Sequence, residues 1–257
     1  MRIEARQVRM DYVLPNKKKL PVIDNLNVDI DDGQFVCLLG PSGCGKSTFL
    51  RCIAGLEYPT TGLIEVDGHK VEGPGPDRSM VFQDYALFPW CTVAQNVLFG
   101  VRLRANRGHN IRPEPDLLKE LIDLVGLEGF EHAYPHQLSG GMRQRVGIAR
   151  ALSVNPGALL MDEPFAAIDA ITRESMQKQL LSVWEKTRKT IIFVTHSVEE
   201  AAFLGDRVHV FAPRPTSIRE SFTINLPRPR DPASPAFVKL AQQMRESINS
   251  GMRRPTP

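Results

Sequence analysis

The sequence contains no long hydrophobic run and carries little net charge. No stretch of about 18 consecutive apolar residues occurs, so no segment is long enough to cross a membrane as a helix. Residues 1–6 are charged and lack the apolar core of a signal peptide. Basic and acidic residues are interspersed and leave a net charge of only +3, which argues against a dedicated nucleic-acid-binding protein. These absences predict a cytosolic protein that meets a membrane only through a partner.

Cysteine and histidine are also sparse. The four cysteines form no C-x-x-C pair, and the six histidines are scattered without the spacing of metal ligands. Reduced core or loop cysteines are therefore favoured over a metal site or disulfide bonds. With 257 residues the chain can still bury a large core, in one or two domains.

The most informative segment is a glycine-rich loop between an expected strand and an expected helix. Residues 35–39 are apolar and predict a buried strand, whereas residues 46–54 follow a helical pattern. The glycines allow a turn whose N–H groups face an anion at the helix N-terminus. The pattern G-x-x-x-x-G-K-[ST] predicts that Lys46 reaches the β- and γ-phosphates and that Ser47 binds Mg²⁺. The alternative is a glycine-rich turn with a surface lysine. The predicted phosphate site comprises Gly40, Pro41, Ser42, Gly43, Cys44, Gly45, Lys46, Ser47 and Thr48.

Short strands are predicted on both sides of this loop. Residues 3–8 and 22–30 show strand patterns. The lysine triplet Lys17–Lys19 between them is interpreted as a solvated hairpin tip rather than a binding patch. Further short strands are expected around residues 64–66 and 79–82.

From about residue 84 to residue 155 the pattern becomes helical. Strand signals vanish there, and a loop containing Gly and Pro is expected at Asn106–Pro115. Buried strands then return, separated by helices, which predicts a mostly parallel sheet. These strands are expected at residues 158–161, 191–195 and 208–211. After Pro213 prolines accumulate, and a helix at 237–250 with a frayed end at 252–257 is expected.

Two adjacent carboxylates follow one of the apolar strand patterns. A carboxylate at the C-terminal end of a strand is where phosphate-loop proteins hold Mg²⁺, so Asp162 is predicted to bind the ion through water. Glu163 points in a different direction and is predicted to act as the general base that polarises the attacking water. The alternative is an ordinary acidic turn at a strand end.

Two other polar residues follow strand patterns. His196 follows the strand at 191–195, and we interpret it as a donor to the γ-phosphate that also holds Glu163 in place. A lone histidine, however, is more often structural. Gln83 follows the strand at 79–82; its amide is predicted to bind Mg²⁺ or orient water and to sense domain closure.

A second anion site is predicted at Ser139, Gly140 and Gly141. The serine precedes the amphipathic run 142–152, and serine is a good N-cap for a helix. The helix N-terminus offers N–H groups and positive dipole character to an anion. The alternative is an N-cap without a ligand, which this segment alone would favour.

In their order and spacing these residues resemble the ATP-binding cassette (ABC) transporter ATPases. The resemblance covers about residues 1–225, and its most specific part is the signature Leu138–Met142. It implies an α/β fold, namely a P-loop NTPase cassette with a RecA-like core and a mostly parallel sheet, an antiparallel β part and an inserted helical subdomain. The implied division is an ATP-binding core of residues 1–83 and 156–225, a helical subdomain of residues 84–155 and a Pro-rich C-terminal extension of residues 226–257.

The resemblance also implies ATP and Mg²⁺ as cofactors and a site shared by two subunits. A second copy, or a homologous ATPase, would bind head to tail, so that Ser139 and Gly141 contact the γ-phosphate held by the other subunit's P-loop. Asp169 would lie in the loop coupling the two sites, and Tyr12 would stack on adenine. That coupling loop usually reads S/G-A-L-D but here reads A-A-I-D at 166–169, so hydrolysis is expected while coupling could differ. The implied roles are catalytic for Glu163, His196 and Gln83, nucleotide-binding for Tyr12, residues 40–48, Ser139, Gly140, Gly141 and Asp169, and metal-binding for Ser47, Gln83 and Asp162.

Within the family, two segments are similar to bacterial importer ATPases. They are Phe82–Val93 and Asp162–Phe165, and they are most similar to the nitrate/sulfonate/taurine group. Members of that group often carry a Leu-Pro-Arg-Pro element like the one at Leu226–Arg230. The resemblance implies a peripheral subunit at the cytoplasmic face of the inner or plasma membrane. It would drive uptake of a small solute through a permease served by a substrate-binding protein.

The permease contact is expected near Gln83–Val93. The aromatic residues Tyr85, Phe88 and Trp90 would line a groove in which a cytoplasmic helix of the permease docks. The alternative is that these rings pack inside the helical subdomain.

The competing hypothesis is a soluble ABC ATPase that acts on DNA or ribosomes. Chromosome-type members insert a long coiled coil before the signature, whereas the interval from Gln83 to Ser139 holds one helical domain. Ribosome-acting members carry two cassettes, and this chain carries one. A catalytically silent scaffold would lack Glu163 or His196, and both are present. The importer ATPase is therefore favoured, without a nucleic-acid partner, while the transported substrate is left open.

Overall fold

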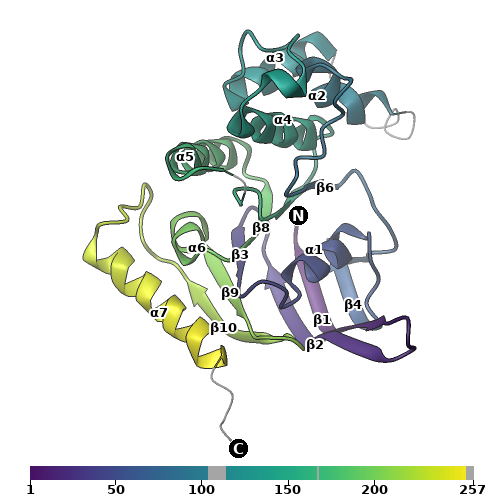
Figure 1. Ribbon diagram of the computed structural model, residues 1–257, viewed down its shortest axis with the longest axis vertical. Helices are drawn as coiled ribbons and strands as arrows, with labels where there is room; N and C mark the ends of the chain where they lie inside the picture. The colour runs from purple at the N-terminus through teal and green to yellow at the C-terminus, as the bar shows by residue number, and fades with distance from the viewer. Residues whose placement is uncertain (104–113, 167, 253–257) are drawn as a thin grey trace, which may run out of the picture. The chain divides into compact units, whose positions relative to one another are not determined.

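The computed structural model describes residues 1–103, 114–166 and 168–252. Backbone contacts divide the chain into two units, the first formed by Met1–Pro74 and Thr190–Pro257 and the second by Gly75–Lys189 (Figure 1). Most of the expected Asn106–Pro115 loop and of the frayed end at 252–257 lies outside the described residues. Among the described helices, none combines the length and apolarity that crossing a membrane requires.

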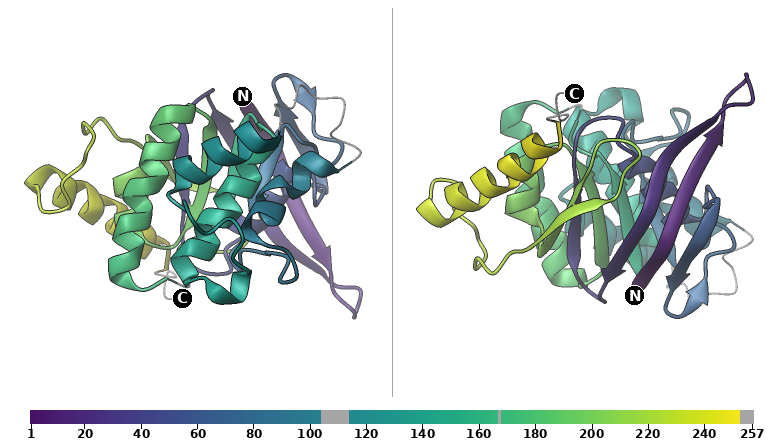
Figure 2. Two further views of the ribbon diagram at one scale, coloured as in Figure 1. Left: turned by 90° about the horizontal axis from the view of Figure 1, so that it is seen from above. Right: turned by 90° about the horizontal axis from the view of Figure 1, so that it is seen from below.

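The first unit contains an antiparallel sheet with the strand order β2-β1-β4-β5. Its strands are β1 (Ile3–Val13), β2 (Lys19–Ile30), β4 (Thr61–Val66) and β5 (His69–Lys70). Figure 2 shows β1 and β2, in purple, as a long twisted hairpin. Lys17 and Lys18 lie at its tip, where the Leu14 N–H donates to the Lys18 carbonyl at 2.9 Å, and all three residues of the lysine triplet are exposed. The predicted hairpin tip is confirmed.

The first unit also contains the parallel strands that carry the glycine-rich loop. Strand β3 (Phe35–Leu39) pairs in parallel with both β8 (Thr190–Thr195) and β9 (Arg207–Phe211). Every residue of β3 and β8 is buried, as expected for a parallel strand covered on both faces. The rings of Phe35 and Phe193 lie 5.9 Å apart in this core, and burying each such side chain contributes about 1.5–3 kcal/mol.

One strand of this sheet was not expected from the sequence. Strand β10 (Ile218–Thr223) pairs antiparallel with β9, and none of its residues is buried. A strand without a buried face has no period-2 pattern to mark it. The helices of this unit are α1 (Lys46–Ala54), α6 (Val198–Leu204) and α7 (Pro235–Met252), the last of which contacts both α6 and β9 (Figure 1).

The second unit combines two parallel strands with a group of helices. Strand β6 (Arg78–Val81) pairs with β7 (Ala158–Asp162), and α4 (Gly140–Ser153) contacts α2 (Val93–Arg102), α3 (Glu114–Val125) and α5 (Ala170–Thr187). A short 3-10 helix, η2 (Pro135–Gln137), precedes α4. The predicted helical character after residue 84 is confirmed. The exact division between core, helical subdomain and C-terminal extension stays a prediction, since these units follow backbone contacts alone.

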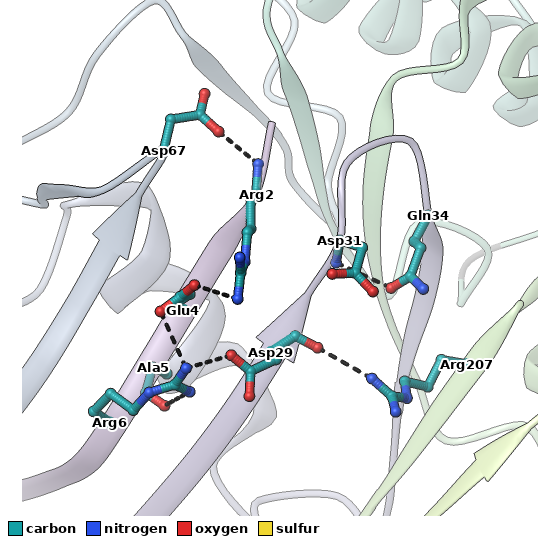
Figure 3. Close-up of polar contacts among 9 residues, drawn as sticks. All are labelled: Arg2, Glu4, Ala5, Arg6, Asp29, Asp31, Gln34, Asp67 and Arg207. Atoms are coloured by element: carbon teal, nitrogen blue, oxygen red, sulfur yellow. Dashed lines mark hydrogen bonds and ion pairs between the residues drawn. The ribbon is translucent and has the colours of Figure 1, made fainter.

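An ionic network connects β1 and β2 on the surface of the first unit (Figure 3). The Arg6 guanidinium lies between Glu4, at 3.0 Å, and Asp29, at 2.5 Å. The hydrogen bond from Arg6 lowers the pKa of Asp29, and the same bond raises the pKa of Arg6. Arg207 of β9 reaches the Asp29 carbonyl at 3.5 Å. These exposed contacts support the strand register, although each such pair contributes little in water.

Candidate functional site

The glycine-rich loop lies where the sequence predicts it, between β3 and α1. Lys46, the first residue of α1, is only 3% exposed, and its ammonium donates to the carbonyls of Gly40 at 2.8 Å and Pro41 at 2.9 Å. A buried cation needs such partners. In the described structure no side chain caps the N-terminus of α1, and its first turn holds no acidic residue. The loop thus concentrates positive charge where an anion is favoured.

His196 lies at the same edge of the parallel strands as this loop. Leu39 pairs with Thr195 in the parallel register, so Gly40 and His196 leave the sheet side by side. The turn after β8 is held by the Thr195 hydroxyl, which donates to Glu200 at 2.5 Å and accepts from the Ser197 N–H at 3.0 Å. The His196 side chain is exposed at this edge.

Tyr12 also lies next to the glycine-rich loop. Its hydroxyl donates to the Glu57 carboxylate and lies 3.4 Å from the hydroxyl of Thr48, in the first turn of α1. Burial and the hydrogen bond to Glu57 raise the pKa of the Tyr12 phenol, so the proton stays on the tyrosine. One region of the first unit therefore contains four of the predicted site residues, Lys46, Thr48, Tyr12 and His196. Glu57 also belongs to this region, and the sequence analysis missed it.

The two predicted carboxylates lie in the second unit, at the end of β7. Asp162 is buried, and Glu163 is half-buried with a left-handed backbone conformation, φ 44. The Ala166 N–H donates to the Glu163 carbonyl at 3.1 Å and closes the turn. Among the described residues no group of three or more His, Cys, Asp or Glu side chains could hold a metal ion.

Gln83 belongs to the same sheet edge of the second unit. Val81 pairs with Met161 in the parallel register, so the segments after β6 and β7 leave the sheet together. The expected strand at 79–82 ends one residue earlier, at Val81, because a turn begins there in which the Tyr85 N–H donates to the Phe82 carbonyl at 3.1 Å. Gln83 therefore lies exposed in that turn.

The predicted second anion loop is the N-terminus of α4. Ser139 is its N-cap and accepts from the Met142 N–H at 3.2 Å. Gly141 is buried against α5, where an added Cβ would lie 2.9 Å from Cγ2 of Thr172. Asp169 caps α5 by accepting from the Thr172 N–H at 3.0 Å, and this backbone hydrogen bond lowers the pKa of Asp169. Thr172, which the sequence analysis missed, thus lies next to Gly141 of the signature through its side chain and contacts Asp169 through its backbone N–H.

The three aromatic residues of the expected docking segment divide between core and surface. Tyr85 is 7% exposed and packs inside the unit, as the alternative hypothesis proposed, whereas Trp90 is 72% exposed. Phe88 lies between them in the sequence and contacts the rings of Trp90 and Phe99, with centroid distances of 5.7 and 4.3 Å. The buried Asn96 side chain holds this turn through the Phe88 N–H at 2.9 Å and its carbonyl at 3.1 Å.

All four cysteines are free in the described structure. Three are buried and Cys91 is partly exposed, which agrees with reduced core or loop residues. Burial raises the pKa of the Cys44 thiol, whose sulfur lies 3.9 Å from the Lys46 ammonium.

Comparisons with known proteins agree with this geometry. A family profile described as ABC transporter matches residues 23–166. The nitrate import ATP-binding protein of Synechocystis sp. is 52% identical over 205 residues, which cover 80% of this chain and 76% of the relative. The taurine import ATP-binding protein of Jannaschia sp. is 46% identical over 222 residues, which cover 86% of this chain and 82% of the relative.

A solved structure shares the fold. It is an ATP-binding cassette in a dimeric post-hydrolysis state bound to ADP and Pi, with a TM-score of 0.72 and 30% sequence identity. The match covers 87% of this chain and 99% of the other. The elements that carry the glycine-rich loop, the two carboxylates and the signature therefore belong to a fold in which a nucleotide and phosphate have been observed.

Proposed function

This chain belongs to the ABC transporter family, and we propose that it is the ATP-hydrolysing subunit of a bacterial importer for a small anion of the nitrate, sulfonate or taurine type. The observation that carries the ATPase assignment is the buried Lys46 ammonium on the loop before α1, with His196 at the same sheet edge. The class of transported anion is supported by the names of the relatives and by the similarity of Phe82–Val93 and Leu226–Arg230 to that group.

The loop of residues 40–48 binds the phosphates in this proposal. Lys46 contacts the β- and γ-phosphates, and the N-terminus of α1 adds the positive end of its dipole. Ser47, Gln83 and Asp162 would provide the oxygen donors that Mg²⁺ prefers. The ion would neutralise the charge that develops on the phosphates.

Glu163 and His196 carry the hydrolytic step. Glu163 accepts a proton from the attacking water as general base, while His196 donates a hydrogen bond to the γ-phosphate. Glu163 has a left-handed backbone conformation, whereas Asp162 is the last residue of strand β7, and in this proposal the two carboxylates take different roles. Tyr12 stacks on the adenine ring.

A second subunit completes the site, in head-to-tail arrangement. Ser139, Gly140 and Gly141 present the N-terminus of α4 to the γ-phosphate of the partner's nucleotide, and Asp169 belongs to the coupling loop. The partner is a second copy or a homologous ATPase, and the dimer lies peripherally at the cytoplasmic face of the membrane. The segment Gln83–Val93 contacts the permease, and a substrate-binding protein delivers the solute to that permease.

Two substitutions test the ATPase proposal. Lys46→Ala removes the phosphate contact and should abolish ATP binding, whereas Glu163→Gln should retain binding, abolish phosphate release and trap an ATP-bound dimer. Size-exclusion chromatography with light scattering and a phosphate-release assay, both with Mg-ATP, measure these outcomes. A mutant that stays monomeric while the wild type turns over ATP would show that Ser139 completes no partner site.

A further inference from the structure

The hydroxyl of Tyr12 is held by two groups, one from α1 and one from the loop after it. Glu57 accepts the phenolic hydrogen bond, and the Thr48 hydroxyl lies 3.4 Å from the same oxygen. Arg51, one turn after Thr48 on α1, contacts the other carboxylate oxygen of Glu57 at 3.4 Å. A chain of polar contacts thus runs from Tyr12 through Glu57 to Arg51, which belongs to α1.

The backbone presents Glu57 to the tyrosine in a fixed position. Gly55 ends α1 in the left-handed conformation, φ 73, and an added Cβ would lie 2.2 Å from the Gly73 carbonyl. The Glu57 N–H then donates to the Arg51 carbonyl at 3.3 Å. Only glycine meets both conditions at position 55. The conformation at the end of α1 therefore fixes the position of the Glu57 backbone, from which its carboxylate reaches Tyr12.

The same loop is attached to the strand that carries Tyr12. The Thr60 N–H donates to the Arg9 carbonyl of β1 at 2.7 Å, and the Asp11 N–H donates to the Thr60 hydroxyl at 2.9 Å. Glu57 is consequently held between α1 on one side and β1 on the other. A carboxylate on such a frame restricts the ring of Tyr12 more strongly than one on a free loop would.

We propose that Glu57 is a positioning residue for the nucleotide base, which holds the Tyr12 ring in the plane that stacks on adenine. This inference rests on the proposed function, in which Tyr12 contacts the base. Binding that must first order an aromatic side chain loses affinity, and a ring already held by its hydroxyl avoids that loss. The raised pKa of Tyr12 keeps the phenolic proton available for the Glu57 bond.

The effect should be specific to the base. Calorimetry with Mg-ATP and with inorganic tripolyphosphate compares a ligand that has adenine with one that lacks it. Glu57→Ala should weaken ATP binding by about three- to tenfold, the range expected for releasing one ordered side chain, and leave tripolyphosphate binding unchanged. Glu57→Gln should restore most of the ATP affinity, because its amide oxygen still accepts from the phenol.

A double-mutant cycle links the effect to the Tyr12 hydroxyl. Tyr12→Phe keeps the ring and removes the hydroxyl, so it should weaken ATP binding as Glu57→Ala does, and the double variant should be no weaker than either. Glu220→Ala removes an exposed glutamate of β10 and serves as the matched control, with unchanged affinity for both ligands. Thermal melting checks that each variant is folded. If Glu57→Ala does not fold, Tyr12→Phe still tests the same hydrogen bond, because it leaves Glu57 unchanged.

The outcomes separate this inference from the proposed function. Unchanged ATP affinity in Glu57→Ala and Tyr12→Phe, or equal weakening of ATP and tripolyphosphate, would overturn the positioning role while leaving the ATPase in place. Additive losses in the double variant would overturn it as well, because the two groups would then act independently. A wild-type protein that binds neither ligand would instead overturn the proposed function, and the positioning role with it.

Discussion

Glu163 has a backbone conformation that residues with a side chain seldom adopt. Glu163 has a φ of 44 and comes directly after the fully buried strand β7. The next two residues, Pro164 and Phe165, are buried as well. Such a conformation costs roughly 1–3 kcal/mol and persists only where the surroundings hold it in place. Strain of this size at the proposed general base is consistent with a carboxylate whose direction matters more than its local stability.

His209 is a second residue whose surroundings determine its chemistry. It is 5% exposed, and its Nδ1 lies 2.7 Å from the Ser221 hydroxyl on the neighbouring strand β10. Its Nε2 is buried and has no hydrogen-bond partner among the residues that the structure describes. Burial, and to a smaller extent the charge of Arg207, lower its pKa to about 4. The imidazole is therefore neutral in the folded protein at neutral pH.

The free energy of unfolding should fall as the pH is lowered through the range between the unfolded and folded pKa values of His209. The unfolded chain takes up a proton near its ordinary pKa of about 6.5, whereas the folded chain does so only near 4. From pH 7 to pH 5 this difference amounts to about 2 kcal/mol. Urea titrations at the two pH values should show a smaller pH dependence for His209→Gln. His69→Gln, which changes an exposed histidine, should retain the wild-type dependence.

At the scale of elements, the segment that contains Arg230 closes the end of α6. The Arg230 side chain is buried and donates to the carbonyls of Ala202 at 2.9 Å, Phe203 at 3.1 Å and Gly205 at 2.7 Å. A helix leaves its last carbonyls without intrahelical partners, and a cation there also complements the helix dipole. The loop of His196 leads into the N-terminus of α6, so Arg230 stabilises the helix that follows this loop.

Arg230→Met should lower the free energy of unfolding by about 2–3 kcal/mol. The substitution leaves buried carbonyl groups without donors, and each unsatisfied group carries a desolvation penalty. Arg230→Lys should recover only part of the loss, because an ammonium cannot reproduce the planar donor pattern of guanidinium. Chemical denaturation measures both effects, with Arg219→Met on the exposed strand β10 as the control. Equal stability of Arg230→Met and the wild type would contradict the capping role.

At the scale of the whole molecule, an exposed aromatic cluster lies on α2 and the turn before it. Trp90 is 72% exposed and Phe99 37% exposed, and both rings contact Phe88. Exposed aromatic residues that are already ordered by neighbouring rings are typical of interface anchors. Phe88 and Trp90 lie in the expected permease segment, and Phe99 adds a residue of α2 to the cluster.

Trp90→Ala should weaken the assembly of the subunit with its permease and so reduce solute uptake. In the proposed docking the lost indole removes an anchor for the permease, while the proposed ATP contacts on the other elements stay intact. We expect the isolated subunit to keep its ATPase rate, while recovery with the permease and solute uptake both fall at least tenfold, the loss expected for a hot spot of about 2 kcal/mol. Tyr58→Ala, which removes another exposed aromatic residue, is the matched control and should leave uptake unchanged. Normal assembly of Trp90→Ala would remove this residue from the interface.

Local sequence patterns were sufficient for the elements that bear the chemistry. The strand at 35–39 and the helix at 46–54 have the predicted bounds, and Ser139 is the expected N-cap. Such features depend on neighbouring residues: apolar periodicity, the conformational freedom of glycine and short-range hydrogen bonds to the backbone. For the same reason the family could be identified from motifs that are each contiguous along the chain.

Contacts between distant segments were decided by the tertiary structure alone. Glu57 meets Tyr12 across 45 positions, and Arg230 reaches Phe203 across 27. Trp90 and Tyr85 are close in the sequence and both aromatic, yet one is exposed and the other buried. No local pattern distinguishes these cases, because burial and partners depend on which elements pack together. The sequence by itself therefore predicted the residues that carry the chemistry. Only the tertiary structure showed which distant residues, such as Glu57 and Arg230, contact them or support the elements beside them.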